Sequence, residues 1–274
     1  MIRVVADVSM RCAFLFLLAT VSIACAADET TDETVPESSS AAIIDGTVEP
    51  NYPAVGILPF TSGSFGSGAL VGSQWVLTAA HVASGSPARF FFGVPTAGKT
   101  PVQANLESAA TDRIVFHPCW PRAGYTRPSA CAKDPTDMAL IHLKAPVTTV
   151  TPLPLIGVPL EYFWGYLSPF EGSKCVAVGF GVWLDANKKA HAGTRRSATS
   201  IIKSVSDGEL QTVRDTGIAT SGDSGSPLLC NGRIVGTVRG SAGAVPTTSQ
   251  YDRNQEGYER TDLHRSWLLD TMSK

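Results

Sequence analysis

The chain has 274 residues, of which 43% are hydrophobic and 17% are charged, and its formal net charge is −2. A near-neutral chain offers no electrostatic footprint for nucleic acid, and this hydrophobic fraction excludes disorder along the whole length. The 25 glycines, 18 prolines and 6 cysteines favour a turn-rich, extracytoplasmic all-β protein of one or two domains.

Residues 1–26 have the features of a secretory signal peptide. Two arginines precede a mostly apolar run over 12–24, which is typical of the hydrophobic region of a signal peptide. Small residues follow this run and predict cleavage after Ala26. A bilayer-spanning helix needs about 20 apolar residues, so this run is too short to span comfortably. Two alternatives remain: a lipoprotein signal with a lipid anchor on Cys25, because the residues before it resemble a lipobox, and a retained anchor.

The segment 27–42 is rich in Asp and Glu, has no Lys or Arg, and contains almost no hydrophobic residue. Such a segment cannot bury enough apolar surface to order itself. A flexible tether and a short propeptide both fit this composition.

From Ile43 onward, short apolar runs alternate with clusters of Gly, Pro and Ser. We expect strands, in chain order, at 54–60, 68–72, 74–80, 113–116, 138–143, 174–180, 226–230 and 232–238. Only 261–272 has an apolar spacing that predicts a helix, through Leu263, Trp267, Leu268 and Met272. Many short strands with turn signals between them indicate a sandwich or a barrel.

Three segments carry residues suited to nucleophilic catalysis. His81 follows a hydrophobic strand, Asp137 opens another, and Ser224 lies in a glycine-rich turn. A serine hydroxyl is a weak nucleophile that needs an imidazole to take its proton and a carboxylate to orient that imidazole. Glycines beside the serine let backbone N–H groups converge on the oxygen that becomes negative.

In this order, the sequences Thr-Ala-Ala-His, Asp-Met-Ala-Leu-Ile and Gly-Asp-Ser-Gly-Ser-Pro resemble those of the trypsin/chymotrypsin-like (S1-type) serine proteases. The resemblance covers Ile43 to about Met272. It implies an all-β fold of two packed six-stranded antiparallel Greek-key barrels and a short C-terminal α-helix. It also implies that His81 is the general base, that Asp137 orients it and that Ser224 is the nucleophile.

The same resemblance assigns two further functional elements. The backbone N–H groups of Gly222 and Ser224 would form the oxyanion hole. The sequence from Ile43 is similar to the activated N-terminus of the family, whose free amino group pairs with the aspartate before the nucleophile, here Asp223. On this hypothesis 27–42 is a propeptide and 43–274 is the peptidase domain. The alternative is that Ile43 merely begins a strand and that Asp223 is solvated.

The cysteines divide into a leader pair and two expected disulfides. Cys175 and Cys230 match a common disulfide of the family, while Cys119 and Cys131 lie in a long stretch between His81 and Asp137 and are expected to close it as a loop. A zinc site is the rival interpretation, although no C-x₂-C spacing occurs. Two frequent family disulfides are missing; Gly66 and Val82 replace one pair, and Thr220 replaces a cysteine of the other.

Substrate preference follows from the residues that the resemblance places around the specificity pocket, namely Ile218, Ala219, Arg239, Gly240 and Ser241. Isoleucine at the base of the pocket cannot pair with a cation, so we expect small or medium apolar side chains at the P1 position rather than Arg or Lys. Arg239 is either an exposed edge residue or a group that biases the pocket towards acidic or polar side chains.

These residues predict a secreted serine endopeptidase that is made as a zymogen. The alternative is an inactive binding protein on the same fold, kept open by the altered substrate strand and by Ser226 where the family has glycine. An esterase of the Gly-Asp-Ser-Leu type is disfavoured, because its motif belongs near the start of an α/β chain. We expect polypeptide substrates, an activating protease, a monomer, no cofactor, no metal, no nucleic acid and no membrane span. His117, His142, His191 and His264 are predicted to be structural or surface residues.

Overall fold

The computed structural model describes residues 43, 45–93, 106–131, 135–160, 168–184, 187, 189–206, 208–219, 221–239 and 254–274. They belong to one compact unit, 38–274. The predicted leader 1–26, the segment 27–42 and the pocket residues Gly240 and Ser241 lie outside the described residues.

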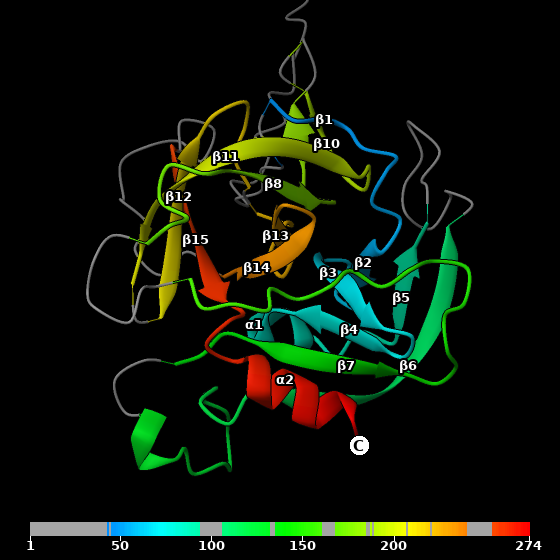
Figure 1. Cartoon of the computed structure of the whole chain (residues 1–274). Helices are drawn as coiled ribbons and strands as arrows, with labels where there is room; N and C mark the ends of the chain where they lie inside the picture. Colours follow the sequence, from blue (N-terminus) through cyan, green and yellow to red (C-terminus); the bar gives the residue numbers. More distant parts are fainter. Residues whose placement is uncertain are drawn as a thin grey trace, which may run out of the picture. The chain divides into compact units, whose positions relative to one another are not determined.

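The first barrel contains six antiparallel strands and closes on itself (Figure 1). Its strands are β2 (Val55–Pro59), β3 (Phe65–Gly72), β4 (Trp75–Thr78), β5 (Arg89–Phe92), β6 (Glu107–Phe116) and β7 (Ala139–Leu143). Their order is β2-β3-β4-β7-β6-β5, so β5 returns beside β2 after three consecutive strands, which is the Greek-key connection. Leu58, Leu70, Val76, Phe90 and Ile141 form part of its core.

The second barrel repeats this connection with the later part of the chain. Its strands are β8 (Lys174–Gly179), β11 (Arg196–Val205), β12 (Glu209–Arg214), β13 (Pro227–Cys230), β14 (Arg233–Val238) and β15 (Gln255–Arg260). Pairing of β8 with both β11 and β13 closes the ring. Two small additions are β1 (Thr47–Val48), which pairs with β11, and the hairpin of β9 (Trp183–Leu184) and β10 (Ala190–His191).

The two barrels share a hydrophobic cluster. Its buried members come from both halves: Val55, Ile57, Ala69, Trp75, Leu77, Met138 and Leu140 from the first, and Val178, Phe180, Leu229 and Ile234 from the second. Burial of apolar surface therefore docks one barrel on the other.

Helical structure is limited to α1 (Ala80–Ala83), a 3₁₀ turn at Ser129–Cys131 and α2 (Arg265–Met272). The predicted helix over 261–272 thus starts four residues too early. Thr261 still belongs to the sheet, because its N–H donates to Val235 O at 3.1 Å and its hydroxyl to Ile234 O at 2.9 Å. Leu263, which was expected on the buried face of the helix, is 47% exposed.

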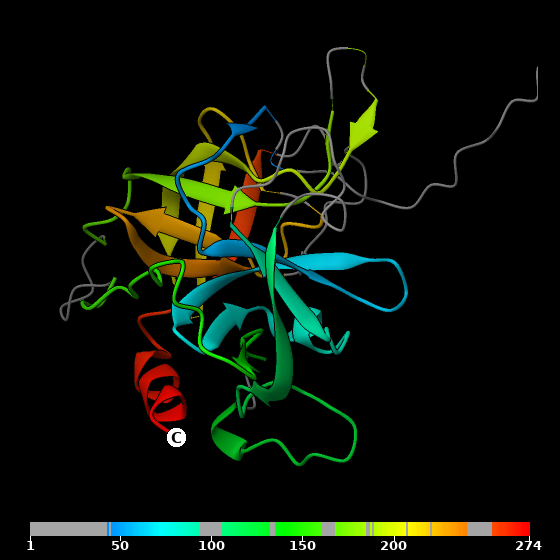
Figure 2. The same cartoon turned by 90° about the vertical axis from the view of Figure 1, so that its right-hand side faces the viewer.

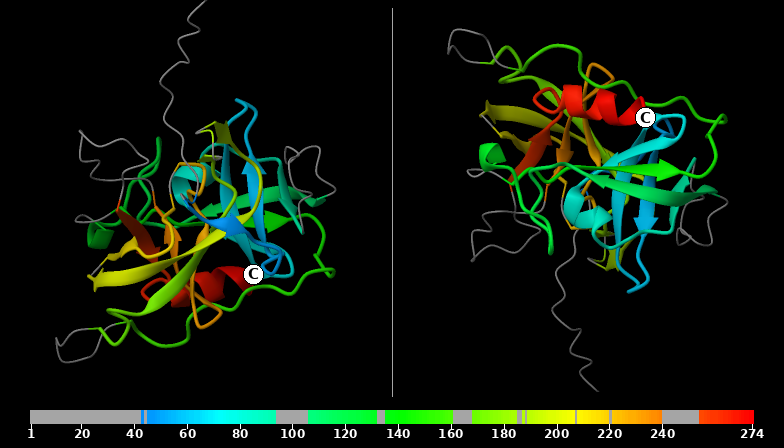
Figure 3. Two further views of the ribbon diagram at one scale, coloured as in Figure 1. Left: turned by 90° about the horizontal axis from the view of Figure 1, so that it is seen from above. Right: turned by 90° about the horizontal axis from the view of Figure 1, so that it is seen from below.

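The C-terminal helix crosses back to the first barrel, as the views of Figures 1 and 2 agree. Leu268 is fully buried in the shared cluster, and Trp267 packs against it. Met272 lies close to Gly72 at the end of β3, so α2 ends beside the first barrel (Figure 3). Within the described ranges, no helix is long and apolar enough to cross a bilayer.

The cysteine pairing is as predicted. Cys119 is bonded to Cys131, and Cys175 is bonded to Cys230, so these four sulfurs cannot form the rival zinc site. Where the family has a third bridge, an added Cβ on Gly66 would lie 2.6 Å from a methyl group of Val82. Direct packing of a branched side chain on a glycine therefore replaces that covalent link.

Candidate active site

His81 is placed by the end of a buried strand. All four residues of β4 are buried, and the antiparallel register pairs Thr78 with Ala139. Continuing this register beyond Thr78 brings the residues that follow it beside those that precede Ala139, which include Asp137. The short helix α1 buries Ala80 and Val82 and leaves the His81 side chain 34% exposed.

Asp137 contacts His81 through both carboxylate oxygens. Its Oδ1 accepts the backbone N–H of His81 at 2.9 Å, and its Oδ2 lies 2.7 Å from His81 Nδ1. A carboxylate can only accept, so the shared proton belongs to Nδ1 and the neutral ring presents Nε2 as a proton acceptor. The nearly complete burial of Asp137 keeps water from competing for these bonds.

The turn that carries Ser224 is pressed against the segment that leads to His81. Gly225 has a φ of +80°, and a Cβ added to it would lie 2.1 Å from Thr78 Oγ1 and 2.8 Å from Ala79 N. No side chain fits there, so glycine is required by both the backbone conformation and the space. The contact places Ser224, from the turn before β13, near the residues that precede His81.

Ser67 of β3 fixes this turn from the first barrel. Its N–H donates to Ser224 O at 2.8 Å, and its hydroxyl donates to Gly222 O at 3.0 Å. Within the described part of the chain, the N–H groups of Gly222 and Ser224 have no hydrogen-bond partner. These two donors are therefore available to a ligand oxygen, as the oxyanion-hole prediction requires.

Ser224 Oγ and His81 make no hydrogen bond with each other among the described residues. Hydrogen bonds of this kind are often long in ligand-free sites and tighten when substrate binds. The structure thus brings together His81 and Asp137 by direct bonds and Ser224 by the packing of its turn.

Ile43 and Asp223 are both fully buried. Ile43 packs in the core of the second barrel, and Asp223 Oδ1 accepts the N–H of Gly181 at 2.9 Å. A Cβ on Gly179 would lie 2.1 Å from the same carboxylate oxygen, so glycine there leaves room for it. The alternative in which Asp223 is solvated and Ile43 begins a strand is therefore wrong.

The predicted pocket residues divide into apolar and charged groups. Ile218 and Ala219 are fully buried. The Arg239 side chain is only 11% exposed, and its Nη1 lies 3.9 Å from Glu259 Oε2. Arg239 is therefore not an exposed edge residue, which corrects one of the two interpretations of its role.

Glu259 contacts the candidate site, although it lies in none of the sequence motifs. Its carboxylate, in β15, accepts the backbone N–H of Asp137 at 3.0 Å. The only sequence signal is alternation along the strand, which puts Glu259 and Tyr258 on opposite faces; Tyr258 packs in the barrel core.

The four remaining histidines have ring contacts or hydrogen bonds that account for them. His142 Nδ1 lies 2.7 Å from Asp112 Oδ1, and the ring of His191 stacks on Trp183. The rings of His117 and His264 are in contact with each other, with centroids 4.5 Å apart. Burial, together with the charge of His264, lowers the pKa of His117 to about 4.

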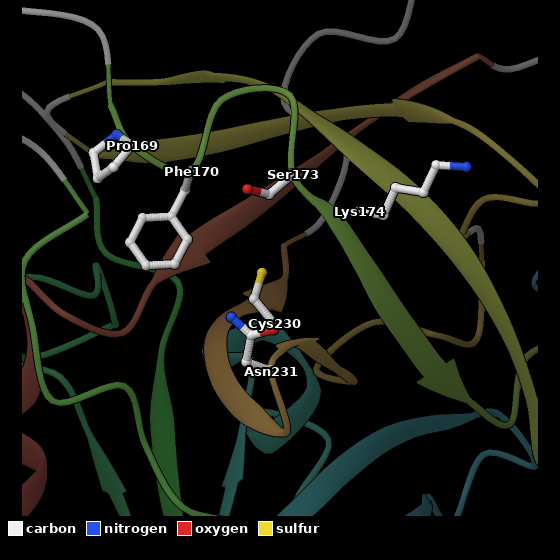
Figure 4. A pocket seen from close by; sticks show the side chains of 6 residues that line it. All are labelled: Pro169, Phe170, Ser173, Lys174, Cys230 and Asn231. Atoms are coloured by element: carbon white, nitrogen blue, oxygen red, sulfur yellow. The ribbon is translucent and has the colours of Figure 1, made fainter.

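A hollow of about 440 Å³ lies next to the Cys175–Cys230 disulfide (Figure 4). It is lined by Pro169, Phe170, Ser173, Lys174, Cys230 and Asn231. The Lys174 side chain extends away from the Phe170 ring, and its Nζ pairs with Asp215 at 3.0 Å. The hollow contains neither His81 nor Asp137 nor Ser224.

Comparison with known proteins finds similarity to serine proteases over most of the chain. A family model described as Trypsin matches residues 44–255. The calcium-dependent serine proteinase of Mesocricetus auratus is 37% identical over 117 residues, which are 42% of this chain and 16% of that protein. Snake venom serine protease KN5 of Trimeresurus stejnegeri is 27% identical over 231 residues, covering 78% of this chain and 80% of that protein.

Among solved structures, the scabies mite inactivated protease paralogue S-D1 is similar in fold. It has a TM-score of 0.62 and 17% sequence identity, and the match covers 84% of this chain and 97% of that one. At this identity the likeness concerns the fold alone.

Proposed function

The chain belongs to the trypsin-like serine protease family, and from this premise we propose that it is a secreted serine endopeptidase acting through His81, Asp137 and Ser224. The observation that carries the proposal is the double contact of Asp137, which holds the backbone and the ring of His81 together. That arrangement leaves Nε2 free of its own proton and able to accept one from a serine.

The reaction follows from the arrangement of these groups. Ser224 Oγ attacks the carbonyl carbon of the scissile peptide while His81 Nε2 takes the hydroxyl proton. The N–H groups of Gly222 and Ser224 donate to the carbonyl oxygen as it becomes negative. His81 then passes the proton to the leaving amine, and the buried Asp137 stabilises the transient imidazolium. A water molecule then attacks the acyl carbonyl carbon while His81 Nε2 takes its proton. The acyl group leaves Ser224 as a carboxylic acid, and His81 returns the proton to Ser224 Oγ.

Activation by cleavage before Ile43 belongs to the same proposal. The new amino group of Ile43 would pair with Asp223, whose buried carboxylate precedes the nucleophile. An ammonium group beside this buried carboxylate would compensate its charge, so the ion pair would order the oxyanion turn. The two disulfides fit an oxidising compartment, which supports secretion.

Covalent labelling with a fluorophosphonate tests the catalytic role. We expect label on Ser224, located by peptide mass mapping, and loss of label in His81→Ala. His142→Ala is the matched control, because His142 also bonds an aspartate at 2.7 Å yet lies outside the site; it should label normally. Protein that starts upstream of Ile43 should label poorly. Full labelling of that form would refute activation by cleavage.

Absence of label on correctly processed protein would favour the inactive binding protein instead. The scabies mite paralogue of this fold is described as inactivated, so the fold does not separate the two functions. The presence of all three reactive residues and of both free N–H donors favours the enzyme.

Substrate preference is inferred from the buried Ile218 and Ala219. Apolar side chains at the predicted base of the pocket favour small or medium apolar P1 residues and give a cationic P1 group no partner. A panel of peptides with Ala, Val, Leu, Phe, Glu or Arg at P1 measures this. Fastest cleavage after Arg would contradict the inference.

A further inference from the structure

Glu259 has a buried carboxylate that contacts the backbone of the candidate catalytic residue Asp137. It lies on β15 of the second barrel and is 2% exposed. Its Oε2 accepts the backbone N–H of Asp137 at 3.0 Å. Asp137 in turn bonds both the backbone and the ring of His81. A single carboxylate of one barrel therefore holds the residue of the other barrel that orients the histidine.

Three charged or titratable side chains lie around this carboxylate, and a fourth contacts one of them. Arg239 Nη1, at the end of β14, is 3.9 Å from Oε2, and His264 Nε2, just before α2, is 3.3 Å from Oε1. Glu209 is the cross-strand partner of Glu259 on β12. The ring of His117 packs on His264. Burial of a carboxylate is unfavourable unless hydrogen bonds or a cation compensate it, and the Asp137 N–H, His264 and Arg239 are placed to do so.

We propose that Glu259 is a positioning residue: it fixes the backbone of Asp137, and through it His81, while Arg239 neutralises its charge at the site. The inference rests on the proposed function, in which His81 is the general base. The competing interpretation is that Glu259 and Arg239 form an ion pair that serves stability alone. The two interpretations differ in what happens to His81 when one member of the pair loses its charge.

Glu259→Gln removes the negative charge of the side chain but keeps the hydrogen bond with the Asp137 N–H. The amide oxygen still accepts from Asp137, and His264 can accept from the amide nitrogen in its other tautomer. The loss of this negative charge makes the surroundings of His81 more positive, which disfavours a protonated His81. Arg239→Gln leaves the negative charge instead and favours a protonated His81. The two substitutions therefore act on His81 in opposite directions.

The first measurement is the NMR titration of the His81 ring in the purified protein, as the producing cell processes it. We expect the titration midpoint to fall in Glu259→Gln and to rise in Arg239→Gln, each by about half a pH unit or more. The double variant should return close to the unmodified protein. Asp262→Asn is the control, because it breaks another buried ion pair, with Arg260, and should leave the midpoint unchanged.

Midpoints that stay unchanged, or that move in the same direction in both single variants, would overturn the charge balance. Glu259→Leu tests the hydrogen bond: it should lower the labelling rate at high pH by about tenfold or more, because the support of Asp137 is lost. Circular dichroism confirms that this variant is folded. A labelling rate equal to that of the unmodified protein would overturn the positioning role.

The NMR titrations can be interpreted whether or not the chain is a peptidase. If the unmodified protein does not label, the proposed function fails, whereas the His81 titrations still decide whether Glu259 and Arg239 act on that ring.

Discussion

Gly225 lets the nucleophile turn sit against the strand that leads to His81. Its left-handed backbone conformation and the close approach of Thr78 and Ala79 leave no place for a side chain. The contact of Gly225 with Thr78 and Ala79 therefore also sets where the Ser224 side chain lies relative to the first barrel.

Gly225→Ala should therefore damage both stability and reactivity. Strain at φ +80° costs of order 1–3 kcal/mol, and the clash with Thr78 adds to it. Urea unfolding should show the loss, and fluorophosphonate labelling should slow. Gly232→Ala is the matched control: Gly232 has a φ of +71° with nothing nearby, so it should lose only the strain and keep its labelling rate. Equal losses in both variants would contradict the argument from space.

The three candidate catalytic residues could be singled out from the sequence because each lies in a short local motif with a chemical reason for its residue types. Glu259 could not, because the residue it supports is 122 positions away and meets it only through the packing of two barrels. The sequence leaves two interpretations of Arg239 open and does not indicate that Glu259 lies beside it. Long-range pairs of buried charges leave no local pattern in the chain.

At the scale of elements, most strands with continuous apolar runs were predicted, although the three phenylalanines of β5 were not, and the polar strands were missed. The expected run at 174–180 became β8, and that at 232–238 became β14. In contrast, β11, β12 and β15 carry many Ser, Thr, Gln, Glu and Arg residues. Strands of a closed barrel can be polar on the outer face and still pair fully, so hydrophobicity underestimates them. The helix was found, but its first turn belongs to the end of the sheet.

Two adjacent leucines of α2 test how the helix is attached. Leu268 is fully buried, whereas Leu269 is 40% exposed. Leu268→Ala should lower the free energy of unfolding by about 2–5 kcal/mol, while Leu269→Ala should change it by less than about 0.5 kcal/mol. Urea unfolding of both variants measures the difference. Similar values for the two would mean that the helix does not dock through Leu268.

At the scale of the whole molecule, His117 lies where the first barrel meets the C-terminal helix. Its ring contacts Trp267 with centroids 4.8 Å apart, and its Nδ1 accepts the N–H of Cys119 at 3.2 Å. Both contacts suit an uncharged ring. Burial lowers the pKa of His117 to about 4 from the usual 6.5, so the unfolded chain binds this proton at a higher pH than the folded chain does.

Stability should accordingly fall as the pH drops from about 6.5 to about 4, with no further loss from this group below that range. His117→Gln keeps an acceptor for Cys119 and removes the titration. The free energy of unfolding, measured in urea at several pH values, should therefore fall more steeply with acidification in the unmodified protein than in the variant. A difference between them that does not change with pH would rule out His117 as the source.

The docking of the two barrels has a consequence for how the molecule fails. His81 and Asp137 come from one barrel and Ser224 from the other. The hydrogen bonds from Ser67 to Gly222 and from Asp137 to Glu259 are among those that link the two barrels. A displacement of one barrel relative to the other by less than the length of one such hydrogen bond would abolish activity, while each barrel kept its own internal hydrogen bonds. Loss of activity would then precede any change in the spectroscopic signals that report unfolding.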